Sequence, residues 1–193
     1  SRMTPAAWAL KVASPKYFRY RIATKSFMVR EKIKRSDKKQ LIYAMLDRSK
    51  SMQQGERIYK LLAILLNRLR AVGRREAVLG YSFFDSDVHE QVMVREVAEA
   101  REEIRKLHFD FFMGDDTDIN LALREGIKRI RSLVDDIQAE RPELIIVTDG
   151  DHGINVQPKE LKGIILHVFI VEEANDDLIQ LANKTGGVAL QQL

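Results

Sequence analysis

The sequence predicts an α/β fold with a mostly parallel central sheet. From Leu41 onward, apolar runs of strand length alternate with longer segments of helical period, which is the pattern of strands connected by helices. With 193 residues, of which 45% are hydrophobic, the chain can bury one substantial core. Because it contains no run of about 18 apolar residues, we expect no membrane span.

The first core strand is predicted at Leu41–Leu46. This run is short, nearly all apolar and closed by the polar turn Asp47–Ser51, as expected of a strand buried on both faces near the sheet centre. A helix then follows and ends at Gly73, since apolar residues recur with i, i+3, i+4, i+7 spacing at Ile58, Leu61, Leu62, Leu65, Leu66 and Leu69.

The next segments predict a hairpin at one edge of the sheet. Ala77–Phe84 forms its first strand, and Val88–Val94 returns antiparallel after the turn at Asp85–Asp87. An amphipathic helix follows, with its apolar face formed by Val97, Ala100, Ile104 and Leu107.

The second half continues the alternation of helices and strands. The apolar face of the next helix comprises Ile119, Leu123, Ile127, Ile130 and Val134. Buried strands are predicted at 144–148 and 164–171, a helix at 176–184 that ends at the glycines 186–187, and a short strand at 188–190. Helices on both faces of one sheet make a three-layer sandwich.

The N-terminal segment differs from the rest in charge. Residues 1–40 contain 12 Lys and Arg but only 2 Asp and Glu. We therefore divide the chain into a basic N-terminal arm or docking segment, residues 1–39, and a domain of residues 40–193. Weak alternation at Phe27, Val29 and Ile33 is compatible with an edge strand near 27–34.

Polar side chains cluster at the ends of the predicted strands. Asp47, Ser49 and Ser51 follow the first core strand, Thr117 precedes a helix, and Asp149 follows the strand at 144–148. In a parallel sheet, ligands collect at the carboxyl ends of the strands, where these loops converge. All five side chains offer oxygen donors, which predicts a site for a hard cation.

This set resembles the metal-ion-dependent adhesion site of the von Willebrand factor A family, whose signature is Asp-x-Ser-x-Ser, then Thr, then Asp at a later strand end. The resemblance covers roughly residues 39–190 and implies a Rossmann-like fold. It also implies that Asp47, Ser49, Ser51, Thr117 and Asp149 bind Mg²⁺ or Mn²⁺, directly or through water.

The chemistry of magnesium agrees with this interpretation. Mg²⁺ prefers about six oxygen ligands near 2.1 Å, so carboxylates and hydroxyls suit it better than imidazole. Two aspartates roughly neutralise the ion and the hydroxyls add no charge, so it stays able to accept a carboxylate from outside. We therefore predict a non-enzymatic module that binds an Asp or Glu of a protein partner.

The sequence also departs from the family pattern. Lys50 replaces the usual glycine between the two serines, and Asp115 and Asp116 stand where glycines often precede the threonine. The short stretch after the last strand leaves no room for a long C-terminal helix, so we expect no long-range switch. Simpler structural roles also exist, because Asp47 and Thr117 could cap helices and Asp149 could be a turn residue.

Other functions compete with the adhesion interpretation. A Mg²⁺-dependent phosphoryl-transfer hydrolase would use Asp47 as nucleophile, but Ser49 stands where such enzymes need a second acid. Nucleic-acid binding through the basic arm is a second alternative, which we consider less favoured. The four histidines show no metal-ligand spacing.

The absence of cysteine excludes disulfides and thiolate metal sites and fits a reducing compartment. Without a recognisable signal segment, we expect a cytoplasmic protein. Its form resembles bacterial von Willebrand A proteins that work with AAA+ ATPases of the MoxR type, which would make such an ATPase a partner.

Overall fold

A computed structural model describes residues 2–3, 29–30, 40–106, 114, 116–139, 141–150, 152–172 and 174–191. Two compact units divide between Asp37 and Lys38. In the first unit, strand β1 (Arg2–Met3) pairs antiparallel with β2 (Val29–Arg30). The rest of the predicted basic arm, including most of the proposed edge strand near 27–34, lies outside the described residues.

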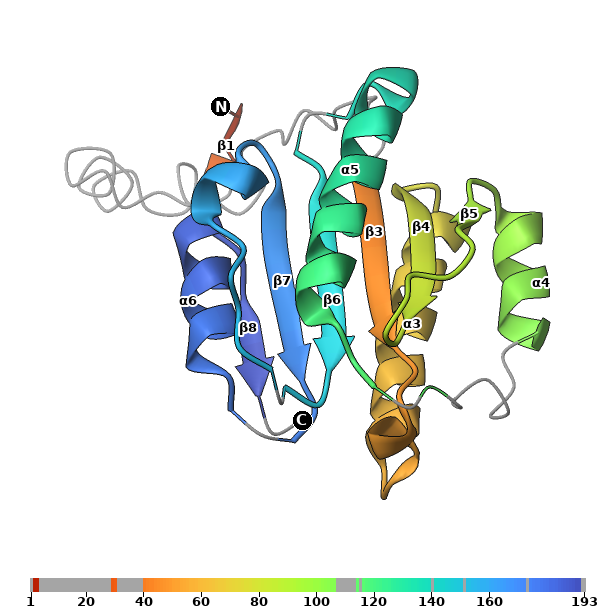
Figure 1. The fold of residues 1–193 in the computed structure, drawn as a ribbon. Helices are drawn as coiled ribbons and strands as arrows, with labels where there is room; N and C mark the ends of the chain where they lie inside the picture. The colour runs from red at the N-terminus through yellow and green to blue at the C-terminus, as the bar shows by residue number, and fades with distance from the viewer. Residues whose placement is uncertain are drawn as a thin grey trace, which may run out of the picture. The chain divides into compact units, whose positions relative to one another are not determined.

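The second unit contains a six-stranded sheet of order β5-β4-β3-β6-β7-β8 (Figure 1). Its strands are β3 (Gln40–Asp47), β4 (Ala77–Phe84), β5 (Val92–Val94), β6 (Glu143–Thr148), β7 (Ile165–Ile170) and β8 (Ala189–Gln191). Only the edge strand β5 runs antiparallel to its neighbour. The predicted α/β fold with a mostly parallel sheet and one antiparallel edge strand is therefore confirmed.

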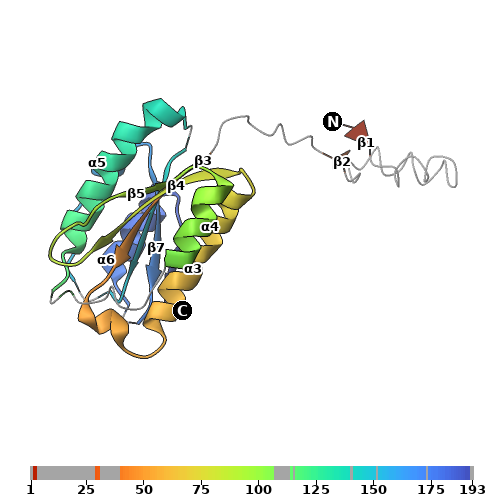
Figure 2. The same cartoon turned by 90° about the vertical axis from the view of Figure 1, so that its right-hand side faces the viewer.

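Helices cover both faces of this sheet, as Figure 2 shows from the side. On one face lie α3 (Arg57–Gly73) and α4 (Val97–Lys106), and on the other lie α5 (Ile119–Ile137) and α6 (Asp176–Thr185). The two apolar layers share β3, whose side chains alternate between them: Tyr43 and Met45 face α5, whereas Ile42 and Ala44 face α3. Burial on both faces explains why β3 is almost continuously apolar.

The predicted boundaries agree closely with the structure, with one instructive difference. The return strand is shorter than expected, because Val88 makes only an isolated bridge with Phe84 before β5 begins at Val92. Helix α6 ends as predicted at Gly186, which adopts the left-handed conformation with a φ of 78°.

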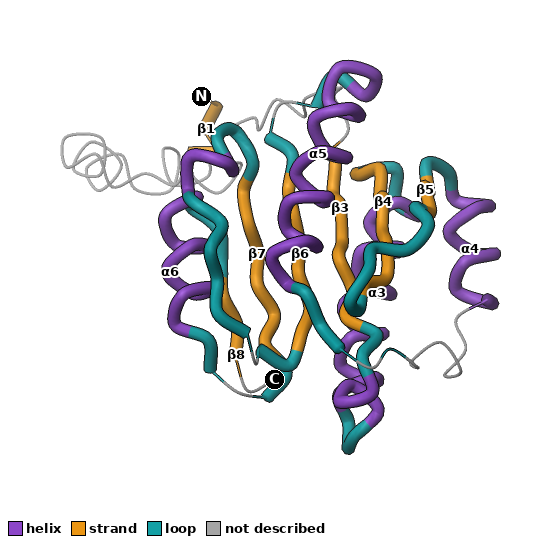
Figure 3. Tube along the Cα trace, in the orientation of Figure 1, coloured by secondary structure: helices purple, strands orange, loops and turns teal. Residues whose placement is uncertain are grey.

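The parallel register brings the loops after β3, β4, β6 and β7 to the same edge of the sheet. Figure 3 shows these loops together at the end toward which the parallel strands run. The loop after β3 contains a 3-10 helix, η1 (Lys50–Gln53). The segment before α5 lies at this edge as well, because Gly114 forms a β-bridge with Ser49, the residue before η1. This edge contains all five residues predicted to bind metal.

Candidate metal site

Asp47 is the last residue of β3 and is fully buried. One carboxylate oxygen accepts a hydrogen bond of 2.9 Å from the backbone N–H of Ser49, and the other accepts one of 2.8 Å from the Thr148 hydroxyl. Burial nevertheless raises the pKa of Asp47 to about 6, and the negative charge of Asp149 acts in the same direction. A nearby cation would therefore stabilise the ionised form of Asp47.

The two serines of the loop after β3 lie side by side. Their hydroxyl oxygens are 2.9 Å apart, and either can donate to the other. Ser49 occupies the N-cap position of η1, yet its side chain makes no capping hydrogen bond. The Ser49 hydroxyl also hydrogen-bonds the Asp47 carboxylate, which counteracts part of the effect of burial on the pKa of Asp47. The two serine hydroxyls thus connect Asp47 to Ser51.

Thr117 does not cap the following helix. That role belongs to Asp118, whose side chain accepts a hydrogen bond of 2.9 Å from the N–H of Leu121. The simple interpretation of Thr117 as a cap residue is therefore wrong, and Thr117 lies one residue before the N-cap of α5. Asp47 makes no helix cap either, because its backbone contact is with Ser49 in the loop.

Four of the five predicted ligands surround one cavity of about 250 Å³. Its lining consists of Ser49, Lys50, Ser51, Asp116, Thr117, Asp149 and His152. Asp47 does not line this cavity itself, but its carboxylate accepts a hydrogen bond from Ser49, which does. Among the described residues, no three His, Asp or Glu side chains lie close enough to form a metal site by themselves, so an ion here would depend on the hydroxyls.

A second buried aspartate, Asp85, organises the surrounding loops. It pairs with the guanidinium of Arg48 at 2.7 Å and with the ring of His89 at 2.9 Å, and it accepts the N–H of Asp87 at 3.0 Å. Burial opposes its ionisation, but these three contacts outweigh that effect and lower the pKa of Asp85 to about 2. The ion pair with Arg48 fixes the loop that contains the serines.

Gly114 brings the loop before α5 against the loop after β3. The N–H of Lys50 donates to the Gly114 carbonyl at 2.8 Å, and the N–H of Asp118 donates to the Asp85 carbonyl at the same distance. A Cβ atom on Gly114 would lie 2.4 Å from the Cβ of Asp85, so only glycine permits this approach. The position of Thr117 thus depends on Gly114 and Asp85.

The loop that carries Asp149 is fixed mainly by Asn175. This buried side chain donates to the carbonyls of Gly150 at 2.8 Å and His152 at 2.6 Å, and it caps α6 by accepting the N–H of Leu178. On the other side, Asn120 donates to the carbonyl of Gly153. Sequence reasoning missed both asparagines, although a polar residue directly before a helix is a recognisable cap signal for Asn175.

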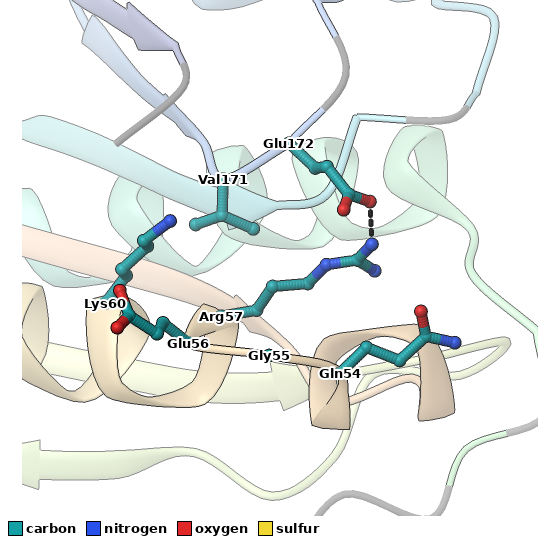
Figure 4. A pocket seen from close by; sticks show the side chains of 7 residues that line it. All are labelled: Gln54, Gly55, Glu56, Arg57, Lys60, Val171 and Glu172. Atoms are coloured by element: carbon teal, nitrogen blue, oxygen red, sulfur yellow. Dashed lines mark ion pairs between the residues drawn. The ribbon is translucent and has the colours of Figure 1, made fainter.

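Arg57 is the most consequential residue that the sequence reasoning missed. It lies on the buried face of α3, one turn before Leu61, and donates to the Ser51 carbonyl at 2.7 Å. The same nitrogen is 3.5 Å from a carboxylate oxygen of Asp149, and the other terminal nitrogen pairs with Glu172, as Figure 4 shows. A charged residue on an otherwise apolar helical stripe was the available signal.

Several solved structures share this fold. Protein BatB from Bacteroides thetaiotaomicron aligns with a TM-score of 0.60 and 17% identity, over 79% of this chain and 89% of that one. An aerotolerance-related membrane protein from Bacteroides fragilis aligns with a TM-score of 0.57 and 15% identity, over 79% and 90%. The PilB minor pilin from Streptococcus sanguinis gives 0.61 and 10%, over 83% and 58%.

No protein-family model matches the sequence, and no curated protein matches it either. In the described part of the chain, no helix combines the length and apolar character needed to cross a membrane. At these identities the structural matches show similarity of fold alone. The chain therefore has a Rossmann-like three-layer fold of the kind that the resemblance to von Willebrand factor A domains implies.

Proposed function

We propose that this chain is a non-enzymatic interaction module that binds Mg²⁺ or Mn²⁺ and uses the ion to bind an acidic side chain of a protein partner. One observation carries the proposal. A small cavity lined by hydroxyls and Asp149 adjoins the buried carboxylate of Asp47, which within the described part of the chain has hydrogen-bond donors but no ion-pair partner.

The donor set fits a hard divalent cation. Ser49, Ser51, Thr117 and Asp149 would provide oxygen ligands around the cavity, directly or through water, while Asp47 would supply a second negative charge behind Ser49. Neutral hydroxyls leave the ion electrophilic, so that it can accept a further carboxylate oxygen. The partner would therefore contribute an Asp or Glu.

The burial of Asp47 argues against the hydrolase alternative. A nucleophilic aspartate must reach a phosphorus atom, whereas Asp47 is 0% exposed and both its oxygens accept hydrogen bonds. The narrower proposal that the partner is an AAA+ ATPase of the MoxR type rests on the resemblance to bacterial von Willebrand A proteins. We likewise propose a cytoplasmic location.

Calorimetric titration with Mn²⁺ tests the metal site. We expect the wild type to bind one ion and Asp149→Asn to bind it at least about tenfold more weakly, because a first carboxylate ligand is lost. Asp116→Asn is the matched control, since it removes an exposed carboxylate from the same cavity. Equal losses in both variants, or no binding by the folded wild type, would overturn the proposal.

The interaction is tested by capture of a partner on the immobilised full chain with Mn²⁺ or with a chelator. We expect capture to require the ion and to be lost in Asp149→Asn but retained in Asp116→Asn. The captured partner should also lose binding when its interface Asp or Glu is replaced by the amide. Capture that persists in chelator would contradict the proposal.

A further inference from the structure

Arg57 places a fixed positive charge beside the proposed metal site. Its side chain is 11% exposed, and that of Asp149 is 13% exposed, so solvent screens the two charges only weakly. Arginine stays protonated in proteins, and its guanidinium therefore cannot lose this charge when an ion approaches.

The contacts of Arg57 hold it in position independently of Asp149. One terminal nitrogen donates to the Ser51 carbonyl at 2.7 Å, and the other forms an ion pair with Glu172, just beyond the end of β7. The separation of 3.5 Å from Asp149 is longer than either contact. Figure 4 shows the guanidinium directed toward Glu172, while the neighbouring Lys60 side chain extends in another direction.

We propose that Arg57 is a built-in counter-cation that shares Asp149 with the divalent ion and thereby lowers the affinity of the site for the metal alone. This inference rests on the proposed metal-binding function. Two cations near one carboxylate repel each other, so the ion binds more weakly than two aspartates would otherwise allow. The loaded site then carries excess positive charge, which an acidic side chain of the partner relieves.

Metal and partner are consequently coupled. A carboxylate from outside is attracted by both the ion and Arg57, and by linkage its binding strengthens that of the ion by the same factor. Glu172 sets the degree of competition, because it draws the guanidinium away from Asp149. Removal of Glu172 should leave Arg57 closer to Asp149 and weaken metal binding further.

The test compares Arg57→Gln with Lys60→Gln in calorimetric titrations with Mn²⁺. Both variants remove one positive charge from a second cavity, distinct from the proposed metal cavity, which Arg57 and Lys60 line together with Glu56 and Glu172. Of the two cations, only Arg57 contacts Asp149. We expect Arg57→Gln to bind Mn²⁺ on the order of tenfold more tightly than the wild type, and Lys60→Gln to differ by no more than about twofold.

A double-mutant cycle separates the role of Glu172 from simple loss of negative charge. Glu172→Gln alone should weaken Mn²⁺ binding, and this effect should largely disappear in the Arg57→Gln background, because Glu172 acts through Arg57. Glu56→Gln, which removes an exposed carboxylate from the second cavity that Arg57 and Glu172 line, should show no such dependence on Arg57.

The outcomes distinguish this inference from the proposed function. If the wild type binds one ion and Arg57→Gln binds it no more tightly than Lys60→Gln, the counter-cation role is wrong and the metal site stands. If neither wild type nor a folded Arg57→Gln binds an ion, both are wrong. Should Arg57→Gln fail to fold, unchanged Mn²⁺ affinity in Glu172→Gln would still overturn the inference.

Discussion

Two buried aspartates at adjacent strand ends have opposite electrostatic environments. Asp47 ends β3 and Asp85 directly follows β4, the neighbouring parallel strand. Asp85 has Arg48 and His89 as partners and its pKa falls to about 2, whereas the pKa of Asp47 rises to about 6 through burial. Arg48 balances the charge of Asp85, whereas Asp47 has no ion-pair partner among the described residues, and on the proposed function a bound cation would balance its charge.

Replacement of each aspartate by asparagine should break this comparison most directly. We expect Asp85→Asn to lower the free energy of unfolding by about 3 kcal/mol at pH 7, because it leaves Arg48 without its charged partner and weakens the contacts of two loops, the one after β3 and the turn after β4. Asp47→Asn, measured with chelator, should be neutral or stabilising, because the amide removes the cost of a buried charge.

Urea denaturation checks both values, and Asp87→Asn is the control. Asp87 is an exposed residue of the same turn as Asp85, so its replacement should change stability by no more than about 0.5 kcal/mol. If Asp85→Asn were as well tolerated as Asp87→Asn, the organising role of Asp85 would be refuted.

The pH dependence of stability should have opposite signs for the two residues. A folded pKa of about 6 for Asp47, against an ordinary 3.8, means that the folded state binds more protons between these values. The chelated protein therefore loses up to about 3 kcal/mol from this group as pH rises from 4 to 6. The pKa of Asp85 is instead lowered from 3.8 to about 2, so this residue contributes stability that is lost as pH falls from about 4 to 2.

Difference curves isolate these contributions from those of other carboxylates. Subtraction of the Asp47→Asn stability profile from that of the wild type should leave a slope between pH 4 and 6, and the Asp85→Asn difference should slope below pH 4. A flat Asp47 difference curve would show that its carboxylate is not desolvated as the structure indicates.

Replacement of Lys50 should give the smallest of these effects, a slight change in Mn²⁺ affinity. Lys50 lines the cavity at the position of the family's glycine, but it is exposed, so water and salt screen its charge. We expect Lys50→Gln to tighten Mn²⁺ binding by about twofold at low salt, and by less at about 0.5 M salt. If Lys50→Gln tightened Mn²⁺ binding as much as Arg57→Gln at both salt concentrations, the difference in exposure between Lys50 and Arg57 would not determine how strongly each charge affects the metal site.

Much of the architecture followed from local patterns. The continuous apolar run at residues 41–46 predicted β3, because a strand that is buried on both faces needs apolar residues at every position. The apolar stripe from Ile58 to Leu69 predicted α3, because a helix that is buried on one face has apolar residues three or four positions apart. The sequence also predicted that the five candidate ligands meet at one edge of the sheet, since parallel strands present their carboxyl ends there, and the structure places four of them around one cavity.

The sequence by itself thus determined the order of strands and helices and the oxygen donors at the strand ends. Only the tertiary structure decided which charges meet there: Arg48 pairs with Asp85, Thr148 donates to Asp47, and Arg57 lies between Asp149 and Glu172. Periodicity tells which face a residue occupies, but contacts between residues as distant as Arg57 and Asp149 depend on strand register and on how α3 packs. Those are properties of the assembled core rather than of any local segment.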